Sequence, residues 1–151
     1  MALQEKYINL FTDFGFKKIF GEEVNKELLI SFLNTILPDN QIAELTHRKT
    51  EHLPQTDLDR KVIYDLYCEN ERGEKFIVEL QKAKQSFFKD RTLYYSTFPI
   101  QEQAQKGVWN FELQAVYTVA VLDFCFDDEN SDKIKVPVKL ADIDTGKVFY
   151  D

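Results

Sequence analysis

The sequence predicts an α/β fold in which a mixed sheet of four or five strands is flanked by helices, and three patterns carry that prediction. Apolar residues recur at helical spacing over residues 22–37. Two strand-forming segments, 61–68 and 76–81, flank a polar reversal. A further apolar run, 115–122, follows a second helical segment. The expected order is therefore helix, three strands, helix and strand, and 151 residues suit one domain with a single core.

The first of these helices is expected to end at Pro38, which cannot continue it. One side of it should pack against the sheet, and that side carries Leu28, Leu29, Phe32, Leu33, Ile36 and Leu37. Ahead of it, a phenylalanine-rich stretch around Gly15 should form a loop and the first turns of a helix, with Asp13 as a candidate N-cap. The second helical segment, 86–105, contains Pro99, which should kink or end it.

The two strand-forming segments are expected to pair as an antiparallel hairpin, because the stretch 69–75 holds the Asn and Gly that a reversal needs. A reversal centred near Arg72 places Asp65 opposite Glu79, since the two are equally far from that centre. Strand alternation then puts Gln81 on the same face as Glu79. The opposite face carries Phe76, Val78 and Leu80.

Two carboxylates at directly paired positions repel each other unless one is protonated or a cation lies between them. Asp65 and Glu79 would be such a pair. Mg²⁺ takes one or two carboxylates and keeps several waters, which a phosphate can displace. The pair therefore predicts, in outline, a metal site that acts on phosphodiesters.

Asp65, followed in this sequence by the run Glu79-Leu80-Gln81, resembles the core motif of the PD-(D/E)XK nucleases. Three more blocks occur in the order of the transposase-associated, recombination-promoting branch of those nucleases, and they are residues 12–21, 32–37 and 91–95. The resemblance implies a restriction-endonuclease-like core and a metal-dependent DNA endonuclease linked to transposition or recombination. It further implies that Asp65, Glu79 and the Leu80 carbonyl hold Mg²⁺ or Mn²⁺, and that Gln81 orients the attacking water.

The sequence departs from the motif at two positions. Gln81 replaces the lysine of the family name, and Tyr64 replaces the proline before Asp65. A neutral amide can orient a water but cannot stabilise developing negative charge as an ammonium does. An alternative is therefore a nuclease-fold module with weak or no cleavage that binds DNA or a protein partner. A third reading is an unrelated α/β protein in which the two acids are exposed strand residues.

Residues around the motif are candidates for supporting roles. Asp13 is a candidate extra acid for the metal site, with a helix cap or surface acid as the alternative. Lys82, Lys84 and Arg91 follow the predicted catalytic strand and could contact DNA phosphates, although the net charge of −7 argues against bulk electrostatic binding. For the lysines the alternative is a solvated surface, and for Arg91 it is a structural ion pair.

The remaining features carry less functional information. The run 115–122 is expected to be a buried central strand, and two short strands are expected around 144–147. His47 and His52 are expected on the surface, and Cys68 and Cys125 are expected to be reduced core thiols. The acids Asp57, Asp59 and 127–132 are expected in solvated loops, with a place at the edge of the site as the alternative for Asp57 and Asp59. The sequence shows neither an apolar run of membrane-spanning length nor a signal-peptide core, so a cytoplasmic location is expected. The chain ends on strand-forming residues, which suggests the N-terminal catalytic part of a longer protein, and a homodimer is left open.

Overall fold

The computed structural model describes residues 7–52, 61–104, 107–125 and 132–150. A mixed four-stranded sheet forms its centre, in the order β1-β4-β5-β6. Neighbours among the first three strands are antiparallel, whereas β5 and β6 are parallel. These strands are β1 (Leu45–His47), β4 (Leu66–Asn70), β5 (Lys75–Gln81) and β6 (Val116–Leu122). The predicted chain order of helix, three strands, helix and strand matches the order of the sheet strands and their flanking helices along the chain.

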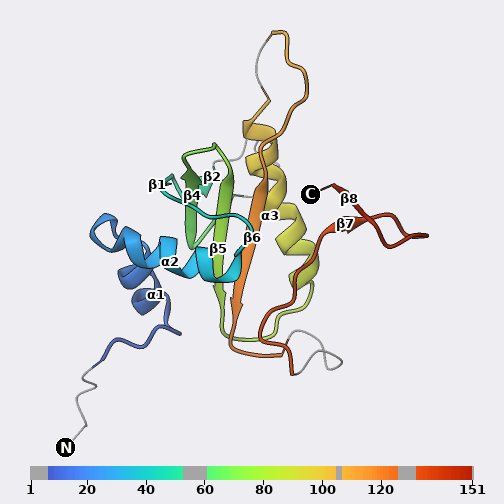
Figure 1. The fold of residues 1–151 in the computed structure, drawn as a ribbon. Coiled ribbons are helices and arrows are strands. Elements are labelled where there is room, and N and C mark those ends of the chain that lie inside the picture. The colour runs from blue at the N-terminus through green and yellow to red at the C-terminus, as the bar shows by residue number, and fades with distance from the viewer. Residues whose placement is uncertain (1–6, 53–60, 105–106, 126–131, 151) are drawn as a thin grey trace, which may run out of the picture.

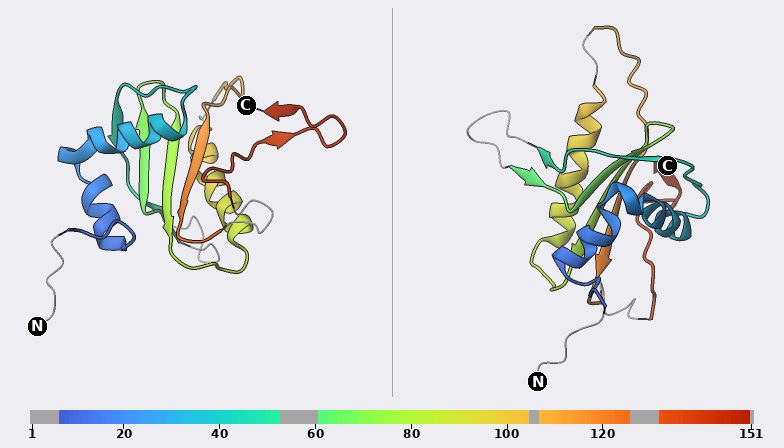
Figure 2. Two further views of the ribbon diagram at one scale, coloured as in Figure 1. Left: turned by 60° about the horizontal axis from the view of Figure 1, so that its bottom comes forward. Right: turned by 90° about the vertical axis from the view of Figure 1, so that its left-hand side faces the viewer.

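Helices cover both faces of this sheet (Figures 1 and 2). They are α1 (Asp13–Phe20), the short 3₁₀ helix η1 (Glu23–Asn25), α2 (Lys26–Ile36) and α3 (Phe88–Glu102). Helices α1 and α2 lie on one face, where Phe16, Leu29 and Leu33 pack with Phe76 and Val78 in the larger core cluster. Helix α3 lies on the other face, over a smaller cluster formed by Val62, Tyr64, Tyr67 and Ile77.

Two small hairpins complete the described structure. Strands β2 (Glu51–His52) and β3 (Val62–Ile63) pair antiparallel, as do β7 (Leu140–Ala141) and β8 (Val148–Tyr150). The second pair confirms the strands expected around residues 144–147. None of the described helices is both long and apolar enough to span a bilayer.

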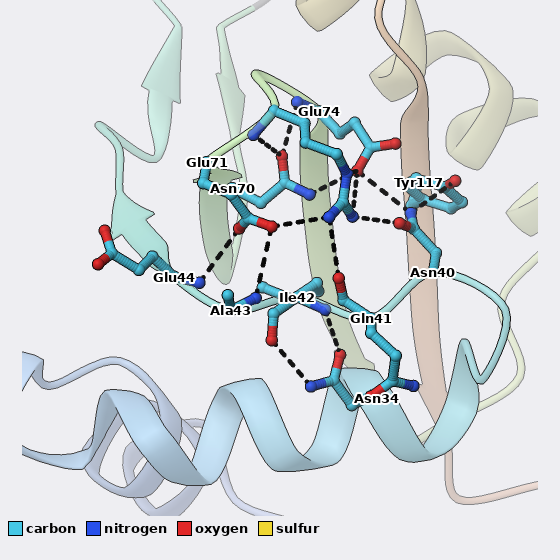
Figure 3. A network of polar contacts seen from close by, with 11 residues as sticks. Asn34, Asn40, Gln41, Ile42, Ala43, Glu44, Asn70, Glu71, Glu74 and Tyr117 are labelled. Carbon is cyan, nitrogen blue, oxygen red and sulfur yellow. Dashed lines mark hydrogen bonds and ion pairs between the residues drawn. The ribbon is translucent and has the colours of Figure 1, made fainter.

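A polar network fixes the reversal between β4 and β5 to the segment that follows α2 (Figure 3). Arg72 donates hydrogen bonds to the Gln41 carbonyl at 2.9 Å and to the Asn40 side chain, and it pairs with Glu71 and Glu74. Because β4 and β5 are antiparallel, this end of the hairpin is opposite to the end that carries Asp65. The network therefore holds the hairpin without occupying the candidate site.

The first arm of the hairpin is not the continuous strand 61–68 that the sequence predicts. Residues Val62 and Ile63 pair with β2, and the main sheet resumes only at Leu66. Between them the Tyr64 side chain is 1% exposed, and its hydroxyl donates to the Tyr95 carbonyl of α3 at 2.9 Å. Burial of this ring under α3 accompanies the break and leaves Asp65 outside the ladder, at the start of β4.

The helices also differ from the prediction in detail. The N-cap of α1 is Thr12 and not Asp13, because the Thr12 hydroxyl accepts the Gly15 N–H at 2.9 Å. Leu28 was expected in the core but is 50% exposed, whereas Ile30 is buried. Of the two alternatives for Pro99, that it ends the helix is wrong, because α3 continues for three more residues to Glu102.

The strand 115–122 was expected in the middle of the sheet, but β6 is the edge strand of the sheet that the described residues form. All of its residues are partly exposed. An apolar run predicts contact with a core on at least one face, and Tyr117, Val119 and Val121 do pack against the larger cluster. The position within the sheet depends on pairing between distant segments, which the run itself does not encode.

The expectations for the histidines and for one cysteine were wrong. His52 is half-buried among Tyr64, Tyr67 and Phe98, with its Nδ1 3.1 Å from Glu102. His47 lies 3.5 Å from the Cys68 sulfur, and burial lowers its pKa. Cys68 is a core thiol as predicted, whereas Cys125 is exposed. Asp57, Asp59 and all but the last residue of 127–132 lie outside the described residues.

Candidate active site

The hairpin register brings the two predicted acids together. Strands β4 and β5 pair with Leu66 opposite Val78 and Glu69 opposite Lys75, so the reversal is centred on Arg72 as expected. One step beyond the ladder, the same register puts Asp65 opposite Glu79. The acids therefore lie at the end of the sheet away from the turn.

Reciprocal hydrogen bonds hold the two carboxylates in place. The Asp65 N–H donates to Glu79 Oε1 at 3.1 Å, and the Leu80 N–H donates to Asp65 Oδ2 at 2.8 Å. Each carboxylate thus accepts a hydrogen bond from a main-chain N–H on the opposite arm of the hairpin. This exchange closes the hairpin beyond its last ladder pair and leaves the acids side by side.

The electrostatics of Glu79 reflect this crowding. Burial, and after it the charge of Asp65, raises the pKa of Glu79 to about 7. The hydrogen bond from the Asp65 N–H and the charges of Arg91 and Lys17 act against that rise. A carboxyl group that titrates near neutrality beside a second carboxylate is typical of a site that receives a cation or a proton.

Gln81 is buried and both ends of its amide are engaged. Its Nε2 donates to the Ala83 carbonyl at 2.8 Å, and its Oε1 accepts from Arg91 Nη2 at 2.6 Å. Arg91 comes from the first turn of α3 and also donates to Gln85 at 2.6 Å. Among the described residues Arg91 has no ion pair, and it donates instead to the side chains of the two glutamines. Gln81 instead brings a guanidinium to the site.

Lys17 of α1 also reaches the site, and the sequence analysis did not identify it. Its Nζ is 2.6 Å from Asp13 Oδ1 and 3.6 Å from Asp65 Oδ1. The hydrogen bond to Asp13 and the charge of Asp65 raise the pKa of Lys17 against its partial burial. The spacing of Asp13 and Lys17 shows that they share a helix face. Nothing in the sequence shows that this face meets Asp65.

The other predicted site residues lie around this centre. Asp13 is exposed and connects to Asp65 through Lys17. Lys82 and Lys84 are exposed on the segment between β5 and α3. The structure thus brings together Asp65, Glu79, Gln81 and Arg91, while the two lysines lie along the segment that leads from Gln81 to α3.

The carboxylate oxygens of Asp65 and Glu79 suit a hard cation that keeps several of its own water ligands. Within the described part of the chain, no group of three or more His, Cys, Asp and Glu is placed to hold a metal ion. Two carboxylates are nevertheless sufficient for Mg²⁺, which usually keeps several waters in its shell. The raised pKa of Glu79 is the local sign that a positive charge would be favourable between these acids.

The described residues thus form a mixed sheet between helices, with paired acids at the end of a β-hairpin and cationic side chains from helices on both faces. The chain belongs to the family described as PD-(D/E)XK nuclease family transposase, whose model matches residues 10–151. This membership confirms the resemblance in the sequence and identifies the sheet as a restriction-endonuclease-like core. The chain matches no curated protein and no solved structure.

Proposed function

We propose that this protein is a metal-dependent DNA endonuclease that hydrolyses phosphodiester bonds during transposition or recombination. The observation that supports the proposal best is the locked pair of Asp65 and Glu79, each accepting a main-chain N–H from the opposite arm of the hairpin. Family membership supplies the nuclease class and implies DNA as the substrate.

In this proposal Asp65, Glu79 and the Leu80 carbonyl hold Mg²⁺ or Mn²⁺. When bound, such an ion polarises a phosphoryl oxygen and lowers the pKa of a coordinated water. The two acids contribute negative charge at fixed positions, because their hydrogen bonds prevent either from rotating away. That preorganisation avoids the cost of ordering the ligands when the ion arrives.

The cationic residues have separate parts in the proposed reaction. Gln81 presents Arg91 toward the acids, where its guanidinium can bind the scissile phosphate in a bidentate way. The second N–H of the Gln81 amide can still orient a water, so that role stays a prediction. Lys82 and Lys84 bind flanking phosphates and set the position of the DNA.

The test is nicking of supercoiled plasmid by the purified protein in Mg²⁺ and in Mn²⁺. Glu79→Gln keeps the shape of the side chain and removes its charge, so cleavage should fall by at least about 100-fold. The thermal stabilisation that Mn²⁺ gives the wild type should also disappear. Glu44→Gln, an exposed site just before β1, is the matched control and should nick like the wild type. Equal nicking by wild type and Glu79→Gln contradicts the proposal.

A second candidate function is a binding module that has lost cleavage. The observation that favours it is Gln81, which lacks the charge of the motif lysine and whose amide is already bonded to Arg91 and Ala83. This module would bind DNA in a gel-shift assay and nick no faster than Glu79→Gln. Metal-dependent nicking above that variant excludes it.

A further inference from the structure

The motif lysine has a candidate replacement in Lys17. In the wider motif the third position carries an ammonium, and here that position is the neutral Gln81. The Lys17 ammonium lies 3.6 Å from Asp65 Oδ1. It therefore lies beside the first residue of the motif, whereas the motif lysine would occupy the third position. A compact ammonium can stabilise the negative charge that develops on a phosphate.

The position of Lys17 is set by the packing of α1. Phe16, the preceding residue, is 2% exposed in the larger core cluster. Phe20 lies one turn later, with its ring 5.3 Å from Phe16 and 5.4 Å from Phe32 of α2. These contacts fix α1 against α2 on both sides of Lys17. Its ammonium is therefore delivered to the end of the β4–β5 hairpin by a packed helix.

The contacts of Lys17 leave it able to act on a bound phosphate. Its short contact is with Asp13, at 2.6 Å, whereas the 3.6 Å to Asp65 exceeds a hydrogen bond. The Lys17 side chain is 42% exposed, so a substrate can reach it. Asp13 holds the ammonium from the solvent side and acts as a positioning residue. Lys18, the next residue, instead pairs with Glu22 at 2.5 Å.

We propose that Lys17 is the displaced lysine of this nuclease: it supplies from α1 the ammonium that stabilises negative charge on the scissile phosphate, the role that Gln81 cannot fill. This inference rests on the proposed endonuclease function. It makes Lys17 a catalytic residue, with Arg91 as the phosphate anchor on the opposite side of the acids.

The experiment compares Lys17→Met with Lys18→Met and with the double variant Lys17→Met/Gln81→Lys. Plasmid nicking in Mn²⁺ measures catalysis, and the Mn²⁺ dependence of the thermal midpoint measures metal binding. Lys17→Met should nick about 100-fold more slowly, the size of effect seen when one preorganised charge-stabilising group is removed. Its Mn²⁺ affinity should be equal to that of the wild type or higher, because a competing cation next to Asp65 is gone. Lys18→Met should nick normally.

The double variant distinguishes catalysis from structure. Gln81→Lys returns an ammonium at the motif position but removes the amide oxygen that accepts from Arg91, so Gln81→Lys alone is the reference for the double variant. In that background Lys17→Met should slow nicking by less than about tenfold, because the new ammonium takes over its role. A loss caused by misplacement of α1 would be as large in that background as in the wild type. Nicking by Lys17→Met within threefold of wild type, or a loss in the Gln81→Lys background as large as that in the wild type, overturns the inference while the endonuclease function stands. If the wild type nicks no faster than Glu79→Gln, the proposed function and this inference both fail.

Discussion

Glu79 keeps a proton in the metal-free protein at pH values where an exposed glutamate has lost it. Its pKa is raised from 4.5 to about 7, first by burial and then by Asp65. Between these values the folded protein binds a proton that the unfolded chain has released. Stability in EDTA therefore decreases as the pH rises through this window.

Glu79→Gln should remove this pH dependence. Urea unfolding in EDTA is expected to show the variant more stable than the wild type at about pH 8 and nearly equal to it at about pH 4. The difference in the free energy of unfolding at pH 8 should be on the order of 1 kcal/mol or more. In Mn²⁺ at pH 8 the wild type should be the more stable protein, because only the wild type is stabilised by binding the ion. Glu44→Gln is the control. An unchanged pH profile for Glu79→Gln would show that this carboxyl is not the group responsible.

Individual site residues differ in how far the sequence predicts them. Asp65 and Glu79 could be paired from the sequence because one local turn determines their register, and the observed ladder agrees. The bond between Gln81 and Arg91 depends on how α3 returns over β5, and the approach of Lys17 depends on how α1 packs. Such contacts join elements whose mutual placement has no local signal, so counting along the chain could not find them.

At the scale of elements, α1 depends on a close approach at Gly15. A Cβ at this position would lie 2.0 Å from the Asn9 carbonyl oxygen and 2.8 Å from the Thr12 hydroxyl, so the loop before the helix leaves no room for a side chain. The Thr12 hydroxyl is also the cap of the helix. Gly15 therefore allows the loop to fold back on the first turn of α1.

Gly15→Ala should destabilise the protein by more than about 1 kcal/mol and lower its thermal midpoint by several degrees. It should also slow nicking, because α1 carries Lys17. Phe14→Ala is the matched control, since the Phe14 side chain is 71% exposed and adjacent on the same helix. Thermal unfolding and plasmid nicking on the same samples test both effects. A Gly15→Ala protein as stable as Phe14→Ala would contradict the steric argument.

The elements also show where pattern analysis reaches its limit. The reversal near Arg72 follows from turn chemistry and was predicted correctly, and the helix expected over 22–37 is present as the 3₁₀ helix η1 followed by the shorter α2. The break at Tyr64 follows from burial of one ring under α3, and the edge position of β6 follows from strand order. Both outcomes depend on tertiary contacts that override local propensity.

At the scale of the whole molecule, DNA binding has to overcome a net charge of −7. Lys82 and Lys84 are exposed on the segment that follows Gln81, and we predict that they form a local basic rim on an acidic protein. Their contribution should be visible in the salt dependence of binding, because each phosphate contact adds about 0.9 to the slope of log K against log salt.

The double variant Lys82→Gln/Lys84→Gln should bind duplex DNA more weakly and lose up to about two units of that slope. Fluorescence anisotropy over a range of salt concentrations, in Ca²⁺ or with the Glu79→Gln background to prevent cleavage, measures both quantities. Lys133→Gln/Lys147→Gln changes the net charge equally at exposed C-terminal sites and is the control. Equal slopes for the two double variants would place the DNA elsewhere.

The hairpin that carries the acids also bears on the order in which the chain folds. Asp65 and Glu79 are fourteen positions apart, whereas β6 pairs with β5 only after the chain has passed through α3. Short loops close at lower entropic cost and sooner than long ones, so we expect the carboxylates to come together when the hairpin forms and before the sheet is complete. At pH values above the pKa of Glu79 both acids are charged, and their repulsion should then oppose this early step. On the proposed function, a divalent cation captured at that stage would speed folding as well as serve the later reaction.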